Sequence, residues 1–358
     1  MNSIKQAKKR YTNIDGLRTF SCLGIIAMHI LVNTEYSEAS GWIKETFIPS
    51  LTLLVYLFMM ISGFGMFCGY YQRVKQNNVD FNYFFNRRFS KILPFFSFLI
   101  ILDIVITRSP SHVIQGLTEI TMVFGLLPNN QLDVVGVGWF LGVVFLYYML
   151  FPFFVFLCWN KKRAWFALAI SIFLNIVCAN YFYTTRFVKA NFADRHTLLY
   201  CAPFFLMGGL IYLYSKEITL FINKRARYVV IPFLITILFY LSLLFLQNTN
   251  LIDLETLILF GAWLSYAIGS NQDNFILTNK ITKYLSKISL EMYLAQMFIF
   301  DAIKKVDFLY IFGKGYLSYI TVLLMTVIGL IIFIEVSEFI LRLAKMEVQR
   351  LFNSKEER

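Results

Sequence analysis

Residues 15–33 read DGLRTFSCLGIIAMHILVN, and the fold follows from the apolar run that fills this stretch. The run matches the ~20 residues that a helix needs to cross a bilayer. The basic residues Lys8, Lys9 and Arg10 precede it, and no small-residue cleavage site comes after it. It is therefore predicted to be a retained first membrane span and not a cleaved signal peptide.

Nine further apolar segments of this kind follow along the chain. They cover residues 48–71, 92–107, 138–158, 164–182, 197–214, 228–246, 253–270, 287–303 and 316–341. The chain is 58% hydrophobic and 15% charged, whereas soluble domains contain roughly 45–50% apolar residues. The sequence thus predicts an all-α fold, a polytopic transmembrane helical bundle of about ten spans. It is expected to form a single membrane domain over residues 1–358.

Most of the 33 Lys and Arg residues lie in alternate gaps between the apolar segments. Because positive residues mark cytoplasmic loops, this pattern places both termini in the cytoplasm. An eleventh segment, 111–127, is shorter and carries His112 and Glu119. If it crossed, the basic clusters at 161–163 and 224–227 would both face outward. It is therefore predicted to be an amphipathic or re-entrant helix on the outer face.

The net charge of +12 does not indicate a nucleic-acid partner, because the basic residues flank apolar runs and do not form one amphipathic surface. The expected partner is the lipid bilayer. The cysteines lie within or beside apolar runs without close pairing, and they predict neither a disulfide framework nor a metal site. They are Cys22, Cys68, Cys158, Cys178 and Cys201.

Two ionisable residues, Arg18 and His29, lie inside the first span. A charged group there costs at least ~2.5–3.5 kcal/mol, so each is a candidate functional residue. Eleven residues at 100° each come within about 20° of three full turns, which places both on one helix face about 16 Å apart. Alone, Arg18 would reach the headgroups and His29 would cap the helix end. Together they indicate a path through the membrane.

Five short motifs keep their order over roughly residues 11–300. They are Asp15-Gly16-Leu17-Arg18 followed by His29, FMMISGF at 58–64, FNRRFSKILP at 85–94, WFL at 139–141 followed by YYMLFP at 147–152, and KISLEMYL at 287–294. In this order the chain resembles the acyltransferase 3 family of membrane-embedded acyltransferases, which modify hydroxyls of surface glycans. It departs from the family pattern at Lys91, often Arg, at Val144, often acidic, and at Gln296, often His.

The resemblance implies an acyl-CoA donor, expected to be acetyl-CoA, that arrives from the cytoplasm. The acceptor would be a hydroxyl of a surface or lipid-linked glycan on the other side. Arg87, Arg88 and Lys91 stand at the cytoplasmic mouth of the third span, where they either hold CoA phosphates with Arg18 or only anchor the helix. His29 would act as general base on the hydroxyl or form a covalent acyl-histidine, and the sequence leaves both routes open.

The remaining candidate residues each have two readings. Asp15 orients the guanidinium of the first span or caps its helix. Ser62 contacts substrate or lets two helices pack closely. Trp139 lines the path of the acyl group or anchors the helix at the interface. Ser289 and Tyr293, four apart on one helix face, bond substrate or a neighbouring helix.

Other classes of membrane protein share some of these features. A transporter or flippase also carries intramembrane charges, but the internal repeat that is typical of transporters is not seen here. A polysaccharide polymerase would place its charged groups in a large external loop, whereas the predicted outer loops are short. The outer stretch 183–196, with Arg195 and His196, suits a polar glycan but receives no catalytic role. The resemblance implies a multi-pass protein of the bacterial inner membrane.

Overall fold

The computed structural model describes residues 10–126, 132, 134–188, 192–224, 229–245, 251–272 and 274–356. Within these ranges the regular secondary structure is helical, apart from an isolated bridge between Ile311 and Gly313. The basic residues Lys8, Lys9, Arg225 and Arg227 lie outside the described residues.

The α-helices are separated by short loops and by single turns of 3₁₀- or π-helix. Their bounds are α1 Asn13–Val32, α2 Ile48–Ser50, α3 Leu54–Lys75, α4 Phe81–Thr107, α5 Pro110–Ile120, α6 Trp139–Met149, α7 Phe151–Leu157, α8 Lys161–Val177, α9 Leu198–Leu213, α10 Ser215–Lys224, α11 Val230–Phe245, α12 Leu251–Gly269, α13 Lys280–Lys287, α14 Ser289–Lys305 and α15 Tyr316–Glu356. The single turns are η1 Ile43–Phe47, η2 Leu51–Leu53, η3 Val123–Leu126, η4 Gly136–Gly138, η5 Cys178–Phe182 and η6 Asp194–His196.

Six helices of the described chain are long and apolar enough to cross a membrane, and two bent helix pairs raise the number to eight. The pair of α6 and α7 bends by 65° where Pro152 begins the second helix, and the pair of α9 and α10 bends by 69°. The other two predicted segments form α11, of 16 residues, and α14, which carries Glu291 and Asp301. The all-α membrane bundle is confirmed, with six to eight clear spans where about ten were predicted.

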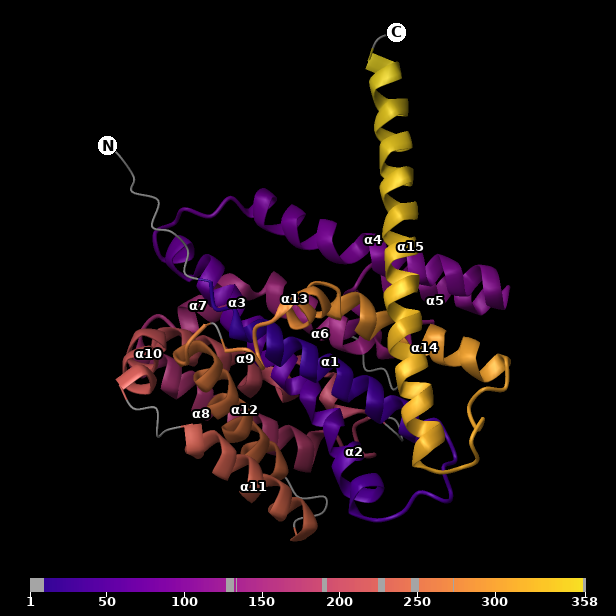
Figure 1. Ribbon diagram of the computed structural model, residues 1–358. Helices are drawn as coiled ribbons and strands as arrows, with labels where there is room; N and C mark the ends of the chain where they lie inside the picture. The colour runs from indigo at the N-terminus through magenta and orange to yellow at the C-terminus, as the bar shows by residue number, and fades with distance from the viewer. Residues whose placement is uncertain are drawn as a thin grey trace.

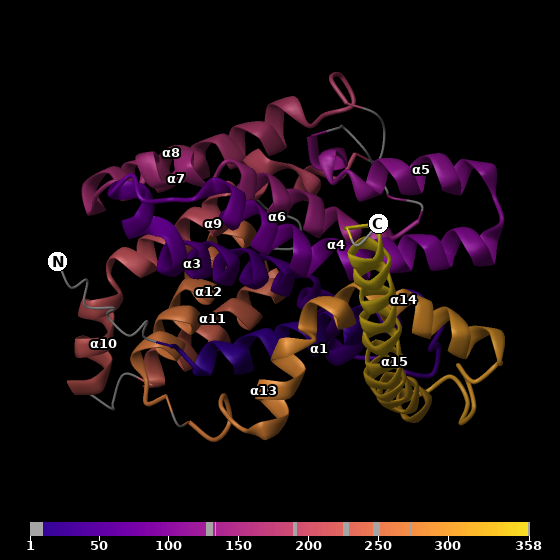
Figure 2. The ribbon, with the colours of Figure 1, turned by 90° about the horizontal axis from the view of Figure 1, so that it is seen from above.

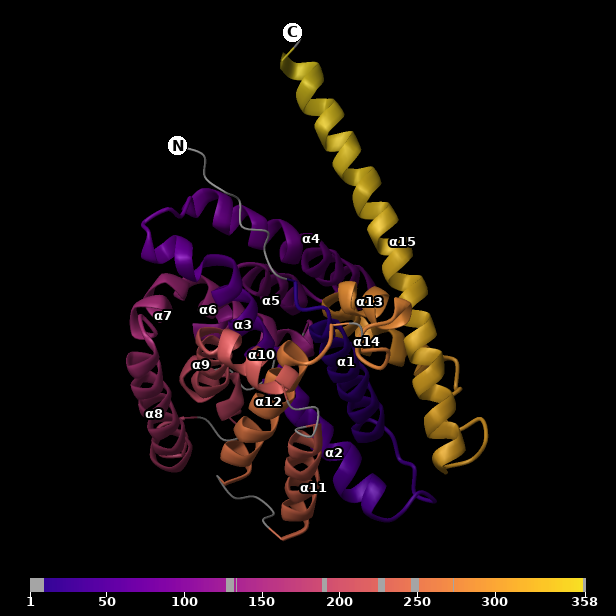
Figure 3. The same cartoon turned by 60° about the vertical axis from the view of Figure 1, so that its left-hand side comes forward.

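Helix α1 lies in the middle of the molecule, where it contacts α3, α12, α13, α14 and α15 (Figure 1). Seen from above, the hairpin of α4 and α5 reaches out at one side and α10 lies at the opposite side (Figure 2). Helix α15, of 41 residues, projects beyond the other helices at its C-terminal end (Figure 3). The central place of α1 makes its polar residues accessible to these five neighbouring helices.

The start of α1 and the end of α15 point toward the same end of the molecule (Figure 1). The hydroxyl of Tyr319, in the first turn of α15, donates to the Ala27 carbonyl near the end of α1 at 3.0 Å. The two helices therefore run in opposite directions. The Thr12 hydroxyl donates to the Gln272 carbonyl at 2.6 Å, so the loop before the basic helix α13 also lies beside the start of α1.

The segment 111–127 does not form a spanning helix in its described part. Helix α5 has 11 residues and packs back along α4. The buried carboxylate of Glu119 accepts hydrogen bonds from the backbone N–H groups of Val134 and Val135 at 3.2 and 3.1 Å. These bonds explain how an acidic residue is tolerated there, since a buried charge needs partners. They also fix the backbone that leads into α6.

Candidate active site

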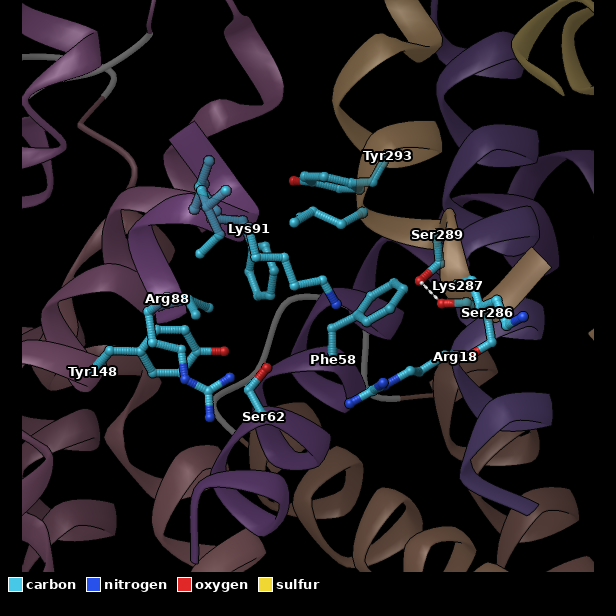
Figure 4. A pocket seen from close by; sticks show the side chains of 15 residues that line it. Arg18, Phe58, Ser62, Arg88, Lys91, Tyr148, Ser286, Lys287, Ser289 and Tyr293 are labelled. Carbon is cyan, nitrogen blue, oxygen red and sulfur yellow. Dashed lines mark hydrogen bonds between the residues drawn. The ribbon is translucent and has the colours of Figure 1, made fainter. Parts of the chain in front are cut away.

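A cavity of about 140 Å³ opens between α1, α3, α4, α6, α13 and α14. Four cationic side chains line it from three helices: Arg18 from α1, Arg88 and Lys91 from α4, and Lys287 from α13 (Figure 4). Ser62, Ser289 and Tyr293 also line it. The structure therefore brings together six of the ten residues that the sequence nominated.

None of these four cations forms an ion pair among the described residues. Asp15 acts on Arg18, and Glu291 on Lys91, only from beyond ion-pair distance. Like charges that converge without a counter-ion repel one another, and the repulsion is stronger away from bulk water. The arrangement thus favours an anionic ligand.

The guanidinium of Arg88 is held by aromatic rings. Its central carbon lies 5.5 Å from the centre of the Tyr70 ring and 5.0 Å from that of Tyr148. Such cation–π contacts orient a guanidinium without using its N–H donors. Its Nε is buried without a hydrogen-bond partner in the described structure, which leaves a donor available for a ligand.

Arg87 lies outside the cavity. It is exposed on α4, and its guanidinium donates to the Tyr83 hydroxyl one turn earlier at 3.3 Å. Successive residues of a helix point about 100° apart, so Arg87 and Arg88 cannot share one direction. The two neighbouring arginines of the motif are thus placed differently.

Asp15 makes two contacts, and neither is to Arg18. Its carboxylate pairs with Arg10 at 3.3 Å and accepts from the Ser286 hydroxyl at 2.9 Å. Asp15 lies in the first turn of α1, while Thr12 holds the capping position. Instead of capping α1 or orienting Arg18 directly, this carboxylate joins the start of α1 to α13.

Helices α1 and α14 run parallel with a constant register. The thiol of Cys22 donates to the Ser289 carbonyl at 3.4 Å, and His29 bonds Gln296 at 2.9 Å, so both pairs are offset by the same number of residues. Arg18 and His29 therefore both lie on the side of α1 that meets α13 and α14. Arg18 lines the cavity, whereas His29 lies three turns farther along and is not among its lining residues.

The hydrogen bonds of Gln296 determine which ring nitrogen of His29 carries the proton. The side-chain amide of Gln296 donates to the Tyr293 carbonyl at 2.7 Å, and a carbonyl can only accept. The amide oxygen of Gln296 therefore faces Nδ1 of His29 at 2.9 Å, and Nδ1 must be the donor. The other nitrogen, Nε2, keeps its lone pair and can act as a base or nucleophile.

Trp139 is not among the lining residues of the cavity and faces the turn η6. Its ring stacks on the His196 imidazole with centroids 4.3 Å apart, and the Arg195 guanidinium lies 5.7 Å from its centre. Burial, followed by the charge of Arg195, lowers the pKa of His196 to about 3, so this imidazole is neutral at physiological pH. Trp139 is thus anchored by aromatic and cationic contacts with η6.

Three aromatic rings in mutual contact form part of the wall of the cavity. The Phe140 and Tyr293 rings meet edge to face at 5.6 Å, and Phe58 lies 6.2 Å from Phe140 and 6.5 Å from Tyr293. The Tyr293 hydroxyl donates to the Val137 carbonyl at 2.9 Å, which fixes its ring. Tyr293 comes one turn before Gln296 on α14, so this wall stands close to the level of His29.

Sequence reasoning noticed Gln296 only as a departure from the family pattern, and it missed the role of Phe58, Phe140 and Tyr148. The spacing of Gln296 from Tyr293, one helical turn, was the available signal for a shared face. In the described chain no group of three or more His, Cys, Asp or Glu side chains is placed to hold a metal ion.

Comparison with known proteins matches residues 11–336 to a family model described as an acyltransferase domain. This match covers most of the chain, including the cavity, His29 and Gln296. Searches of the curated proteins and of the solved structures gave no match.

Proposed function

The chain is a membrane acyltransferase of the acyltransferase 3 family, and from this premise we propose that it carries an acyl group, acetyl in the first instance, from cytoplasmic acyl-CoA to a hydroxyl of a surface or lipid-linked glycan. The observation that carries the proposal is the convergence of four unpaired cations on one cavity beside α1, with an oriented imidazole farther along the same helix. The cations suit binding of an anionic donor, and the imidazole suits activation of a hydroxyl.

In the donor site, Arg88 and Lys91 bind the phosphates of CoA together with Arg18. The unpartnered Nε of Arg88 provides a charge-assisted hydrogen bond, which is about twice as strong as a neutral one. Arg87, on the exposed side of α4, contributes only long-range attraction at the entrance. Ser62 and Ser289 line the cavity and contact the pantetheine arm (Figure 4). The Ser289 hydroxyl donates to the Ser286 carbonyl at 3.0 Å, so it serves the arm as an acceptor.

The acyl group then travels along α1 toward His29. The separation of Arg18 and His29 along the helix, about 16 Å, is of the same order as the length of the pantetheine arm. With the cations holding the phosphates, the thioester carbonyl reaches the level of Tyr293 and His29. Asp15 supports this arrangement by fixing the start of α1 against α13.

In the transfer step, Nε2 of His29 takes the proton of the acceptor hydroxyl while the oxygen attacks the thioester carbonyl. The new acyl carbon–oxygen bond forms and the carbon–sulfur bond breaks. The proton passes from His29 to the leaving thiolate, which departs as CoA thiol. General base catalysis of this kind contributes about 10²–10⁴-fold in rate. In the covalent route, Nε2 of His29 attacks the thioester first and CoA thiol leaves. The acceptor hydroxyl then attacks the resulting acyl-histidine and frees the imidazole.

We also propose that the protein is one domain over residues 1–358 with both termini in the cytoplasm of a bacterial cell and the bundle in its inner membrane. The positive-inside pattern supports this orientation. The directions of the first and last helices also support it, because α1 begins and α15 ends at the same end of the molecule (Figure 1). Trp139, Arg195 and His196 then lie on the outer side, where the acceptor arrives.

The test begins with purified protein, radiolabelled acetyl-CoA and a glycan or lipid-linked sugar as acceptor. The expected result is release of CoA and label on the acceptor. Movement of an intact sugar across a vesicle membrane without label transfer would instead identify a transporter or flippase and overturn the proposal.

Three variants then separate the proposed roles. His29→Ala should lower kcat by about 10²–10⁴-fold and retain donor binding. Arg88→Ala should weaken acetyl-CoA binding by about 10–100-fold, as expected for a lost hydrogen bond to a charged group. Arg87→Ala, the adjacent arginine outside the cavity, is the matched control and should change binding by less than about 3-fold. Full turnover in His29→Ala would remove the proposed base.

A further inference from the structure

The register between α1 and α14 gives each side chain of the site a level in the membrane. Ser289 pairs with Cys22 and Gln296 pairs with His29, so Tyr293 lies between these two levels. One helical turn, about 4.5–6 Å, separates Tyr293 from each of them. A thioester that is held by the cations and extended toward His29 must place its carbonyl near the level of Tyr293.

Phe58, Phe140 and Tyr293 line the cavity, and Figure 4 shows Phe58 and Tyr293 among its labelled side chains. Phe140 and Tyr293 are buried, with 6% and 3% of their surface exposed. The Tyr293 hydroxyl is bonded to the Val137 carbonyl, and its ring packs edge to face on Phe140, so it cannot turn without losing both contacts. Interiors packed in this way resist insertion of even one extra methylene.

We propose that Phe58, Phe140 and Tyr293 form the acyl-chain subsite and restrict the donor to a short acyl group. The inference rests on the proposed function, since it assigns the aromatic part of the wall of the same cavity to the acyl end of the donor. A two-carbon group fits against the rings with its carbonyl directed along α1 toward His29. Each further methylene would have to displace a ring that is fixed by neighbours.

Donors of increasing chain length test the subsite. The ratio kcat/KM should fall by about 10-fold or more from acetyl-CoA to butyryl-CoA and again to hexanoyl-CoA, as for a methylene that a hydrophobic pocket rejects. Phe140→Leu removes part of the wall while keeping an apolar side chain. It should raise the butyryl-to-acetyl ratio by about 10-fold. Phe58→Leu should shift the ratio in the same direction.

Phe145→Leu is the matched control. Phe145 lies on the same helix, packs on Phe89 at 5.2 Å and does not line the cavity, so the ratio should stay as in the unchanged protein. Equal use of hexanoyl- and acetyl-CoA by the unchanged protein would overturn the subsite even if no variant folds. The subsite would also be overturned if the Phe140→Leu variant is active and its kcat/KM falls with acyl length as in the unchanged protein. If no acyl-CoA is consumed by any form, the proposed function itself fails.

Discussion

The hydrogen bond between His29 and Gln296 gives the two ring nitrogens different roles. Nδ1 donates to the amide oxygen, and Nε2 is left with a free lone pair. A residue that holds an imidazole in one tautomer increases the fraction of molecules that are ready to accept a proton. Under the proposed function, Gln296 is therefore a positioning residue for His29.

The first prediction concerns this contact. Gln296→Leu removes the acceptor of the His29 proton and should lower kcat by about 10–100-fold, the usual cost of a lost orienting partner. The KM for acyl-CoA should stay unchanged, because the cation site is three turns away. Gln296→Glu restores an acceptor and adds a negative charge that favours the imidazolium. Its kcat should recover in part, and its pH optimum should move upward. An equal loss of kcat in Gln296→Leu and Gln296→Glu would indicate that Gln296 acts only through packing.

The second prediction concerns His196, whose pKa is lowered to about 3 by burial and by the charge of Arg195. Between about pH 3 and pH 6.5 the unfolded chain binds a proton that folded His196 does not bind. The folded state therefore loses stability as the pH falls below about 6.5, by up to ~1.4 kcal/mol per pH unit. His196→Phe keeps a ring against Trp139 and removes this titration.

Thermal unfolding in detergent at about pH 7 and about pH 5 measures the effect. Acidification should lower the free energy of unfolding of the unchanged protein by about 1–2 kcal/mol more than that of His196→Phe. Activity profiles of the two proteins should have the same midpoint, since His196 does not take part in proton transfer. A parallel loss of stability in both would show that other groups govern the acid response.

At the level of elements, α3 and α9 approach each other so closely that their glycines leave no space for a side chain. A Cβ on Gly63 would lie 2.3 Å from the Phe205 carbonyl oxygen, and one on Gly208 would lie 2.1 Å from that of Met60. Glycine allows the two backbones to approach, as small residues do at membrane helix interfaces. The cavity depends on this approach because Ser62, beside Gly63, lines it.

The third prediction follows from that geometry. Gly63→Ala forces α3 and α9 apart and should destabilise the protein by about 1–3 kcal/mol, the cost of overpacking. Gly65→Ala on the same helix is the matched control, because nothing lies within 4 Å of its added Cβ. It should be neutral or stabilise by up to about 1 kcal/mol through helix propensity. The melting temperatures of both variants in detergent test this prediction. An equal decrease for Gly63→Ala and Gly65→Ala would exclude the steric explanation.

The sequence predicted the elements well because apolar runs of crossing length are a direct consequence of the bilayer. It could not predict where a run breaks into two helices, as between α6 and α7, because the 65° bend depends on Pro152 and on the helices packed around it. It also could not separate Arg87 from Arg88. Their charge and spacing are equivalent until α4 is placed against its neighbours.

For the site, the motifs predicted the cation cluster but not the contacts between helices. Arg18, Arg88 and Lys91 belong to two motifs that only the tertiary fold joins in one cavity. The approach of Gln296 to His29 depends on the register of α1 and α14, which no local pattern contains. The steric role of Gly63 likewise follows from the placement of α9.

Over the whole molecule, the cation cavity and the histidine lie at successive levels of the same central helix. This order matters only if the chain is oriented so that the cavity faces the cytoplasm, where acyl-CoA is made available, and His29 faces the acceptor. The loops that follow α1 and α3 lie at opposite ends of the bundle, so they report this orientation. Ser37 belongs to the first loop and Asn78 to the second, and both are exposed.

The fourth prediction is that a membrane-impermeant maleimide labels Ser37→Cys in intact cells and Asn78→Cys only after the membrane is permeabilised. Of the native cysteines, four are buried and Cys68 is partly buried, so the unchanged protein sets a low background. The physical reason is the excess of Lys and Arg on the side of Asn78, which resists transfer across the membrane. The reverse labelling pattern would turn the cation cavity away from the cytoplasm and leave acyl-CoA without access to Arg18, whatever the activity of the purified protein.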